Sequence, residues 1–146
     1  MHSFIRTCNK QGVKPVFRLN TISDIAWETH LDLAGEFADA FFYDYTKRAN
    51  RLGKTPANYK LMFSYSAVPA YQNQVRKAME TDVPIAVVFK GNLPKMFMNR
   101  PVIDGDASDV VNVQSGRVIV GLLAKGQAKY DTSGFVVDSV DIIGLG

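Results

Sequence analysis

The amino-acid sequence predicts an α/β protein with a mostly parallel sheet and flanking helices. Short apolar runs of strand length recur along the chain, and segments with helical periodicity separate them. The connections between the first runs are long enough for the crossovers that parallel strands require. The run at residues 85–89 is wholly apolar, which is typical of a strand buried on both faces of a sheet. The length of 146 residues fits one domain over residues 1–146.

The first third of the chain begins the alternation of strands and helices. We expect residues 1–15 to form a loosely packed N-terminal arm and residues 16–20 to form the first strand. The apolar residues of segment 25–37 recur at spacings of three and four, which predicts a helix. Residues 40–45 form an aromatic run typical of a strand, and residues 47–52 are expected to form a short helix.

The middle of the chain repeats this pattern. Residues 59–65 are expected to form a strand. Pro69 suits a first helical turn, and the apolar spacing that follows predicts a helix over residues 71–81. The apolar run at residues 85–89 then forms the fourth strand.

The C-terminal third is expected to be more irregular. Residues 92–101 show no clear period, and we expect one helical turn at residues 95–98. Residues 104–106 are a turn signal. Two further strands are predicted, at residues 118–123 and 135–137.

Composition excludes several classes of protein. Hydrophobic residues make up 47% of the chain and charged residues 21%, which is close to the globular average and argues against disorder. Cys8 is the single cysteine, so no internal disulfide can form, and a reducing compartment is favoured. The apolar runs are far shorter than a membrane span, and the first residues lack an apolar signal core. We therefore expect a cytoplasmic protein, within a bacterial host, that has no membrane partner.

Familiar catalytic and cofactor motifs are missing from the sequence. It contains no nucleophile elbow and no glycine-rich phosphate loop. Asp104, Asp106 and Asp109 are weak candidates for a metal site, but they do not match the calcium-loop pattern and an Asp-Gly turn is the favoured interpretation. We expect no metal, no cofactor and no catalytic residue.

Polar side chains follow the predicted strands, at the sheet edge where parallel α/β proteins place their functional groups. The candidates for a binding site at these strand ends are Asn20, Asp24, Lys47, Ser64 and Lys90.

A basic run follows the second strand and supplies the other candidate binding residues, which are Lys47, Arg48, Arg51 and Lys54. Such a run can contact phosphate backbones. The favoured interpretation is nevertheless a solvated surface, because most charge runs have that role. The net charge of +3 adds little to either interpretation.

Several blocks of the sequence resemble the phage gene product 88 family. The blocks are residues 20–24 with Trp27, 42–47 with Arg51, 58–59, 63–64, 100–106, 121–126 and 131–138. Their order and spacing cover the chain from about residue 16 to residue 138. The resemblance also implies a relation to phage proteins with a barrel of the radical S-adenosylmethionine type.

The chain departs from that barrel type at the metal cluster. Three cysteines hold such a cluster, and this chain has Cys8 alone, so no iron–sulfur cofactor is expected. The resemblance implies a partial barrel, because four or five strands do not close one. An open sheet leaves edge strands, which we expect to serve self-association as a homodimer or partner binding. The alternative is that residues 92–117 cover the edge.

These observations favour a small, non-catalytic phage or prophage protein that binds a macromolecular partner, either a host protein or a protein–nucleic acid complex. Inhibition of a host defence complex, as by an anti-CRISPR protein, is one version of this hypothesis. Two alternatives stay open. The strand ends could form the site of an enzyme or small-ligand binder, with S-adenosylmethionine as one ligand. The chain could also bind nucleic acid.

Overall fold

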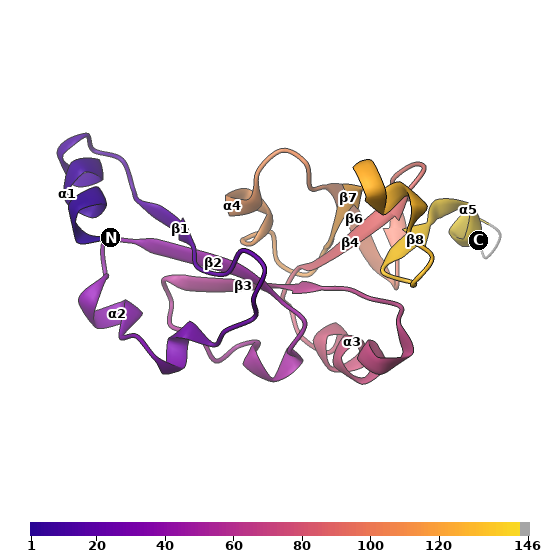
Figure 1. Ribbon diagram of the computed structural model, residues 1–146, viewed down its shortest axis with the longest axis horizontal. Helices are drawn as coiled ribbons and strands as arrows, with labels where there is room; N and C mark the ends of the chain where they lie inside the picture. Colours follow the sequence, from indigo (N-terminus) through magenta and orange to yellow (C-terminus); the bar gives the residue numbers. More distant parts are fainter. Residues whose placement is uncertain (144–146) are drawn as a thin grey trace.

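The computed structural model describes residues 1–143, and within them eight strands form one open, mostly parallel sheet (Figure 1). The strand order is β1-β2-β3-β4-β7-β6-β5, and β8 pairs with β4 off this path. The strands are β1 Val16–Arg18, β2 Phe41–Thr46, β3 Tyr59–Ser64, β4 Ile85–Lys90, β5 Met96–Phe97, β6 Arg100–Asp104, β7 Ile119–Leu123 and β8 Val136–Asp138. Every pair is parallel except the β5–β6 hairpin. The predicted fold class is confirmed.

Short helices cover both faces of the sheet. The α-helices are α1 His2–Lys10, α2 Leu33–Glu36, α3 Gln72–Met79, α4 Asp109–Asn112 and α5 Ser139–Ile143. Four 3₁₀ turns accompany them: η1 Trp27–Thr29, η2 Ala49–Arg51, η3 Pro69–Tyr71 and η4 Gly126–Tyr130. In Figure 1, α2 and α3 lie on one side of the sheet and α4 lies on the other. None of the helices within residues 1–143 has both the length and the apolar character needed to cross a membrane.

Alternating side chains of the central strands build two apolar clusters. The larger cluster includes Phe42, Phe63 and Phe89 and packs against α2 and α3. The smaller one includes Met62 and Val120 and packs against the α4 region. Because both faces of β3 and β4 are covered, their sequences are nearly continuous apolar runs.

Strand β4 has two partners on the same side, and this fork shapes the sheet near the carboxyl end of β3. The first half of β4 pairs with β3, where Ser64 lies opposite Ala86. The second half pairs with β8, where Val88 lies opposite Val136. The chain approaching β8 therefore lies beside the end of β3, and the Ala67 amide donates to the Gly134 carbonyl there.

The predicted strands agree well with the structure, apart from one. Segments 40–45, 59–65, 85–89, 118–123 and 135–137 correspond to β2, β3, β4, β7 and β8. The first strand was expected to reach residue 20 but ends at Arg18. The helix predicted over residues 71–81 is confirmed as η3 and α3, and the short helix at 47–52 is reduced to the single turn η2.

The helix predicted over residues 25–37 is wrong. The structure has η1 and the four-residue α2 there, with Asp32 between them. The Asp32 carboxylate accepts a hydrogen bond from the Gly35 amide at 2.9 Å, which is an N-cap that starts a new helix. The apolar spacing alone predicts one continuous helix, but the N-cap at Asp32 divides this segment into two short ones.

The N-terminal segment is a helix where the sequence predicted a loosely packed arm. In α1, Ile5 and Cys8 are buried, and the Phe4 ring packs edge-on against Phe17 with centroids 5.5 Å apart. The apolar residues of α1 are Phe4, Ile5 and Cys8, a stripe too short to predict a packed helix from the sequence alone.

The segment 92–101 is irregular only over residues 92–95 and contains no helical turn. It carries β5 and the start of β6, joined by Met98 and Asn99, whose φ angles are +48° and +60°. Two positive φ angles in a two-residue loop are typical of the tight hairpin turn. The sequence lacks the Asn-Gly pair that usually signals this turn.

Residues 92–117 lengthen the sheet instead of covering its edge. β6 pairs with β7, and β5 forms the outer strand on that side, while β1 is the outer strand on the other. Both outer strands are short, which limits pairing with other chains. Self-association through an edge stays a prediction.

Candidate functional site

A cleft of about 590 Å³ opens at the carboxyl ends of β1, β2 and β3, and we call it the strand-end cleft. The loop after β1 borders it on one flank and the start of α3 borders it on the other, because the sheet order places β2 between β1 and β3. It is lined by Arg18, Asn20, Thr21, Ile22, Ser23, Asp24, Tyr45, Thr46, Lys47, Arg48, Ser64, Ala70, Tyr71 and Gln74.

Asn20 organises the loop that forms one flank of the cleft. Its side-chain oxygen accepts hydrogen bonds from the Ser23 hydroxyl, the Ile25 amide and the Trp27 indole, at 2.8–3.2 Å. Its side-chain nitrogen donates to the Ile25 carbonyl and to Asp44, each at 3.0 Å. The exposed fraction of Asn20 is 2%. Asn20 is therefore a structural centre of the site whose hydrogen-bonding capacity is used within the protein.

Asp44 lies on β2 directly beneath Asn20 and is fully buried. Its carboxylate accepts hydrogen bonds from the backbone amide of Asn20 at 2.7 Å and from the Tyr59 hydroxyl at 2.6 Å. Burial raises the pKa of Asp44 above its ordinary value, although the hydrogen bond from Tyr59 opposes that effect. Asp44 thus links the loop after β1 to β3.

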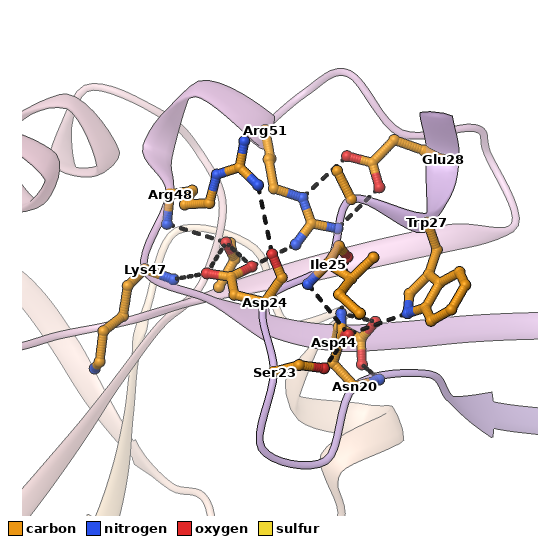
Figure 2. Close-up of polar contacts among 12 residues, drawn as sticks. Asn20, Ser23, Asp24, Ile25, Trp27, Glu28, Asp44, Lys47, Arg48 and Arg51 are labelled. Carbon is orange, nitrogen blue, oxygen red and sulfur yellow. Dashed lines mark hydrogen bonds and ion pairs between the residues drawn. The ribbon is translucent and has the colours of Figure 1, made fainter. Parts of the chain in front are cut away.

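Arg51 is a buried cation whose guanidinium contacts two carboxylates (Figure 2). It forms a paired hydrogen bond with Glu28, at 3.0 and 2.8 Å, and contacts Asp24 at 2.5 Å. It also donates to Tyr59 at 3.1 Å. Burial opposes the charge of Arg51, but the hydrogen bonds that it donates to Glu28 and Tyr59 outweigh this effect and keep its pKa above the ordinary value. Burial also disfavours the charge of Glu28, which raises its pKa. The hydrogen bond from Arg51 outweighs this effect and brings the pKa of Glu28 below its ordinary value.

Asp24 borders the cleft with both carboxylate oxygens already occupied. Besides Arg51, it accepts the Thr46 hydroxyl at 2.8 and 2.9 Å and the Lys47 amide at 2.8 Å. These contacts hold the start of the basic run against the end of β2. A carboxylate with this many donors is not placed to act as a general base.

Lys47 presents its ammonium group inside the cleft, away from the ion pairs of Arg51 (Figure 2). Its Nζ donates to the Ser64 hydroxyl at 3.0 Å. The same nitrogen lies 4.6 Å from the centre of the Phe135 ring and 5.6 Å from that of Tyr71. Burial lowers the pKa of Lys47 from its ordinary value, and the nearby Asp24 partly opposes this.

Two more cations line the cleft without forming an ion pair among the described residues. Arg18 donates to the Asn20 carbonyl at 2.9 Å and lies 4.9 Å over the Tyr45 ring. Arg48 reaches the Asp24 carbonyl at 3.4 Å. None of the ion pairs within residues 1–143 involves Arg18, Arg48 or Lys47. The cleft therefore holds three cations that form no direct ion pair among the described residues, beside the single carboxylate of Asp24.

The structure brings together five of the eight binding residues selected from the sequence: Asn20, Asp24, Lys47, Arg48 and Ser64. Arg51 lies behind Asp24 in the ion-pair network. Lys54 and Lys90 are exposed and lie outside the cleft, Lys54 beside a separate hollow with Glu28. The solvated surface predicted for the basic run is thus wrong for Arg51, which turns inward to meet two carboxylates.

Sequence reasoning missed Arg18, Tyr71 and Gln74. Arg18 belongs to the last position of a strand that is shorter than expected. Tyr71 and Gln74 belong to the first turns after β3, where the residues of a βα connection reach the same sheet edge as the strand ends. Extending the strand-end rule to the start of the following helix would have selected both.

The three aspartates considered for metal binding have separate partners. Asp106 pairs with Lys125 at 2.9 Å, and Asp109 accepts the Tyr45 hydroxyl at 2.6 Å. Asp104 accepts the Asp106 amide in a turn. Within residues 1–143, no group of three or more acidic, histidine or cysteine side chains is arranged to hold a metal ion.

Comparison with known proteins gives one match. A family model described as Gene product 88 matches residues 1–139, which is nearly the whole chain and includes α1. No curated protein and no solved structure matches the chain. The sheet is open, and a relation to radical S-adenosylmethionine barrels stays a prediction. The resemblance seen in the sequence blocks is therefore confirmed at the level of the family, and the chain belongs to the gene product 88 family of phage proteins.

Proposed function

We propose that this protein binds an anionic small ligand in the strand-end cleft. The observation that carries the proposal is the state of Lys47. Its ammonium group is half-buried, contacts the Ser64 hydroxyl and two aromatic rings, and has no carboxylate partner among residues 1–143.

A buried charge without a partner is unfavourable, so a site that keeps one usually has a use for it. The Lys47 ammonium carries three N–H donors, and the contact with Ser64 uses one of them. The Ser64 hydroxyl can donate its own hydrogen to an acceptor beside it. A phosphate or carboxylate group next to these two side chains would receive charge-assisted hydrogen bonds, which are the stronger kind.

The surroundings of Lys47 support the same class of ligand. Arg18 and Arg48 add two cations that form no direct ion pair among the described residues, and the carboxylate of Asp24, which also lines the cleft, contacts Arg51. The start of α3 borders the cleft, and the positive end of a helix dipole also favours anions. All of these groups lie at the carboxyl ends of parallel strands, where open α/β sheets bind their ligands.

S-adenosylmethionine stays an alternative ligand, although its sulfonium group is a cation and its carboxylate is the only part of it that suits Lys47 and the two arginines. The other hypotheses from the sequence, a host macromolecular partner, inhibition of a defence complex and nucleic-acid binding, stay predictions. The cleft adds a specific reason to test small anions first.

Replacing Lys47 with methionine is expected to weaken binding of inorganic pyrophosphate at least tenfold, because methionine has a similar length and no charge. Isothermal titration at pH 7 and low salt measures this change. The matched control is Lys54→Met, which removes an exposed lysine of the same basic run that does not line the cleft. If the two variants bind pyrophosphate as tightly as each other, the cleft is not the anion site.

The affinity for pyrophosphate is also expected to fall as the pH becomes alkaline. Burial lowers the pKa of Lys47, so its charge is lost at a lower pH than that of an ordinary lysine, near 10.4. Binding should therefore weaken as the pH rises toward that value, and a bound anion should oppose the loss by stabilising the ammonium form. A Lys47→Arg variant keeps its charge throughout this range, so between pH 7 and 10 it is expected to lose less affinity than the unaltered protein, the ionisation of pyrophosphate itself being common to both. Identical profiles for the two proteins would contradict a role for the Lys47 charge.

A further inference from the structure

We infer that the anionic ligand is a nucleotide, with its phosphate at Lys47 and its base against Tyr71. The inference rests on the proposed function of the strand-end cleft and adds the chemical class of the ligand. It depends on the aromatic and apolar side chains that surround the cations.

Tyr71 provides a flat surface beside the anion site. It stands at the end of η3, lines the cleft and exposes 37% of its surface. One face of its ring lies toward the Lys47 ammonium, 5.6 Å from the ring centre. A ring stacked on Tyr71 and a phosphate held by Lys47 are therefore close enough to belong to one nucleotide. Bases of every type stack well on such rings.

Ile22 provides an apolar surface on the opposite flank. It lies in the loop after β1, lines the cleft and is fully exposed, although it is a large apolar side chain. Asn20 accepts hydrogen bonds from Ser23 and Ile25, which shape the loop that carries Ile22. A planar base placed between Ile22 and Tyr71 would cover apolar surface on both.

The cleft has suitable size and polar groups for a nucleotide. Its volume of about 590 Å³ lies within the range of small-molecule sites. Gln74 accepts a hydrogen bond from the Ala49 amide through its side-chain oxygen, and its amide nitrogen donates no bond among the described residues. That nitrogen can donate to a ring nitrogen, a carbonyl or a ribose oxygen.

Two sources share this chemistry: a free mononucleotide and the terminal nucleotide of a single-stranded nucleic acid. The experiment compares four probes by isothermal titration at one salt concentration: inorganic phosphate, ribose 5-phosphate, adenosine 5′-monophosphate and a short 5′-phosphorylated adenosine oligonucleotide. We expect the mononucleotide to bind roughly ten times more tightly than ribose 5-phosphate, because stacking adds to the phosphate contact. Tighter binding of the oligonucleotide identifies the strand as the source, and equal binding identifies the free nucleotide.

Variants separate the base from the phosphate. Tyr71→Leu is expected to lower the affinity for the mononucleotide to that variant's own affinity for ribose 5-phosphate, so that the preference for the mononucleotide over ribose 5-phosphate is lost. Tyr130→Leu, at an exposed tyrosine outside the cleft, is the matched control and is expected to change neither. Ile22→Ser, at an exposed loop position where folding is not at stake, is a second variant that should reduce only mononucleotide binding.

The possible failures are distinguishable. Equal affinities for the mononucleotide and ribose 5-phosphate would overturn the nucleotide inference and leave the anion site standing. If none of the four probes binds, or if Lys47→Met leaves all affinities unchanged, both the inference and the proposed function fail.

Discussion

Replacing Arg51 with methionine is expected to lower the free energy of unfolding by about 3–5 kcal/mol, the range found when one partner of a buried ion pair is removed. The guanidinium is 3% exposed and contacts Asp24, Glu28 and Tyr59. Without it, both carboxylates lose the cation that contacts them directly. Urea unfolding followed by circular dichroism measures the change.

Arg48→Met is the matched control, because Arg48 belongs to the same basic run and is exposed. We expect it to change the free energy of unfolding by no more than about 0.5 kcal/mol, as is usual for surface substitutions. Adding Glu28→Gln and Asp24→Asn to Arg51→Met should recover part of the loss, since those changes remove the unpaired charges. A loss below about 1 kcal/mol for Arg51→Met alone would contradict the central structural role of the pair.

The pH dependence of stability gives a second view of this network. The pKa of Glu28 lies below its ordinary value in the folded protein, with Arg51 outweighing the effect of burial. The stability that this group contributes is therefore present above its ordinary pKa and is lost as the pH falls through the lowered value. In the Arg51→Met variant burial acts on Glu28 without the opposing guanidinium, so the contribution of Glu28 to this acid-side loss should shrink.

Replacing Asn20 with aspartate is expected to destabilise the fold by about 3 kcal/mol or more, although the two side chains have nearly the same shape. The amide nitrogen donates to the Ile25 carbonyl and to Asp44 at 3.0 Å, and an oxygen at that position would leave both acceptors facing an acceptor. Each buried acceptor that is left without its donor costs about 1–3 kcal/mol of stability. A second carboxylate beside Asp44 adds repulsion between like charges.

This variant should regain stability in acid. Two buried carboxylates at this distance cannot both ionise easily, so one of them has a strongly raised pKa. A raised pKa contributes stability at low pH and loses it as the pH rises. Between pH 7 and 5, the Asn20→Asp protein should therefore become more stable, and Asn50→Asp, at an exposed position of η2, should not. A pH-independent loss would show that shape, and not charge, matters at Asn20.

The parts of the fold that could be predicted are those fixed by continuous burial. β3 and β4 are apolar at nearly every position because helices or loops cover both faces, and such runs are visible in the sequence. The segment from Ile25 to Phe37 was predicted wrongly because its shape depends on two side chains, Asn20 and Asp32, whose hydrogen bonds compete with the helical period. The hairpin was missed because its turn begins with Met98, a residue type that rarely takes a positive φ, and has no glycine after Asn99.

The same distinction applies to the site. The rule that polar groups meet at the ends of parallel strands selected Asn20, Lys47 and Ser64 correctly as neighbours. It also selected Lys90, which is exposed beside β8 because the second half of β4 pairs with that strand and not with β3. Strand order beyond the first three strands could not be predicted from the sequence, and whether Lys90 reaches the cleft depends on that order.

The burial of Arg51 was also beyond sequence reasoning. A run of four cations in eight residues is usually surface, and its partner Glu28 lies more than twenty positions earlier. Two members of the run, Arg48 and Lys54, do lie at the surface. The division between inward and outward cations follows from the position of η2 against the loop after β1.

The measurement that tests the proposed site most directly is an NMR titration of the isotope-labelled protein with inorganic pyrophosphate. The largest shifts of backbone amide signals should fall in residues 20–24, 45–48, 64 and 70–74, with the Lys47 side-chain signal among them. A second hollow of about 510 Å³, lined by Lys60 and Asp82, lies at the amino ends of β3 and β4 and serves as an internal comparison. Shifts centred on that hollow, or no saturable shifts at all, would contradict anion binding in the strand-end cleft.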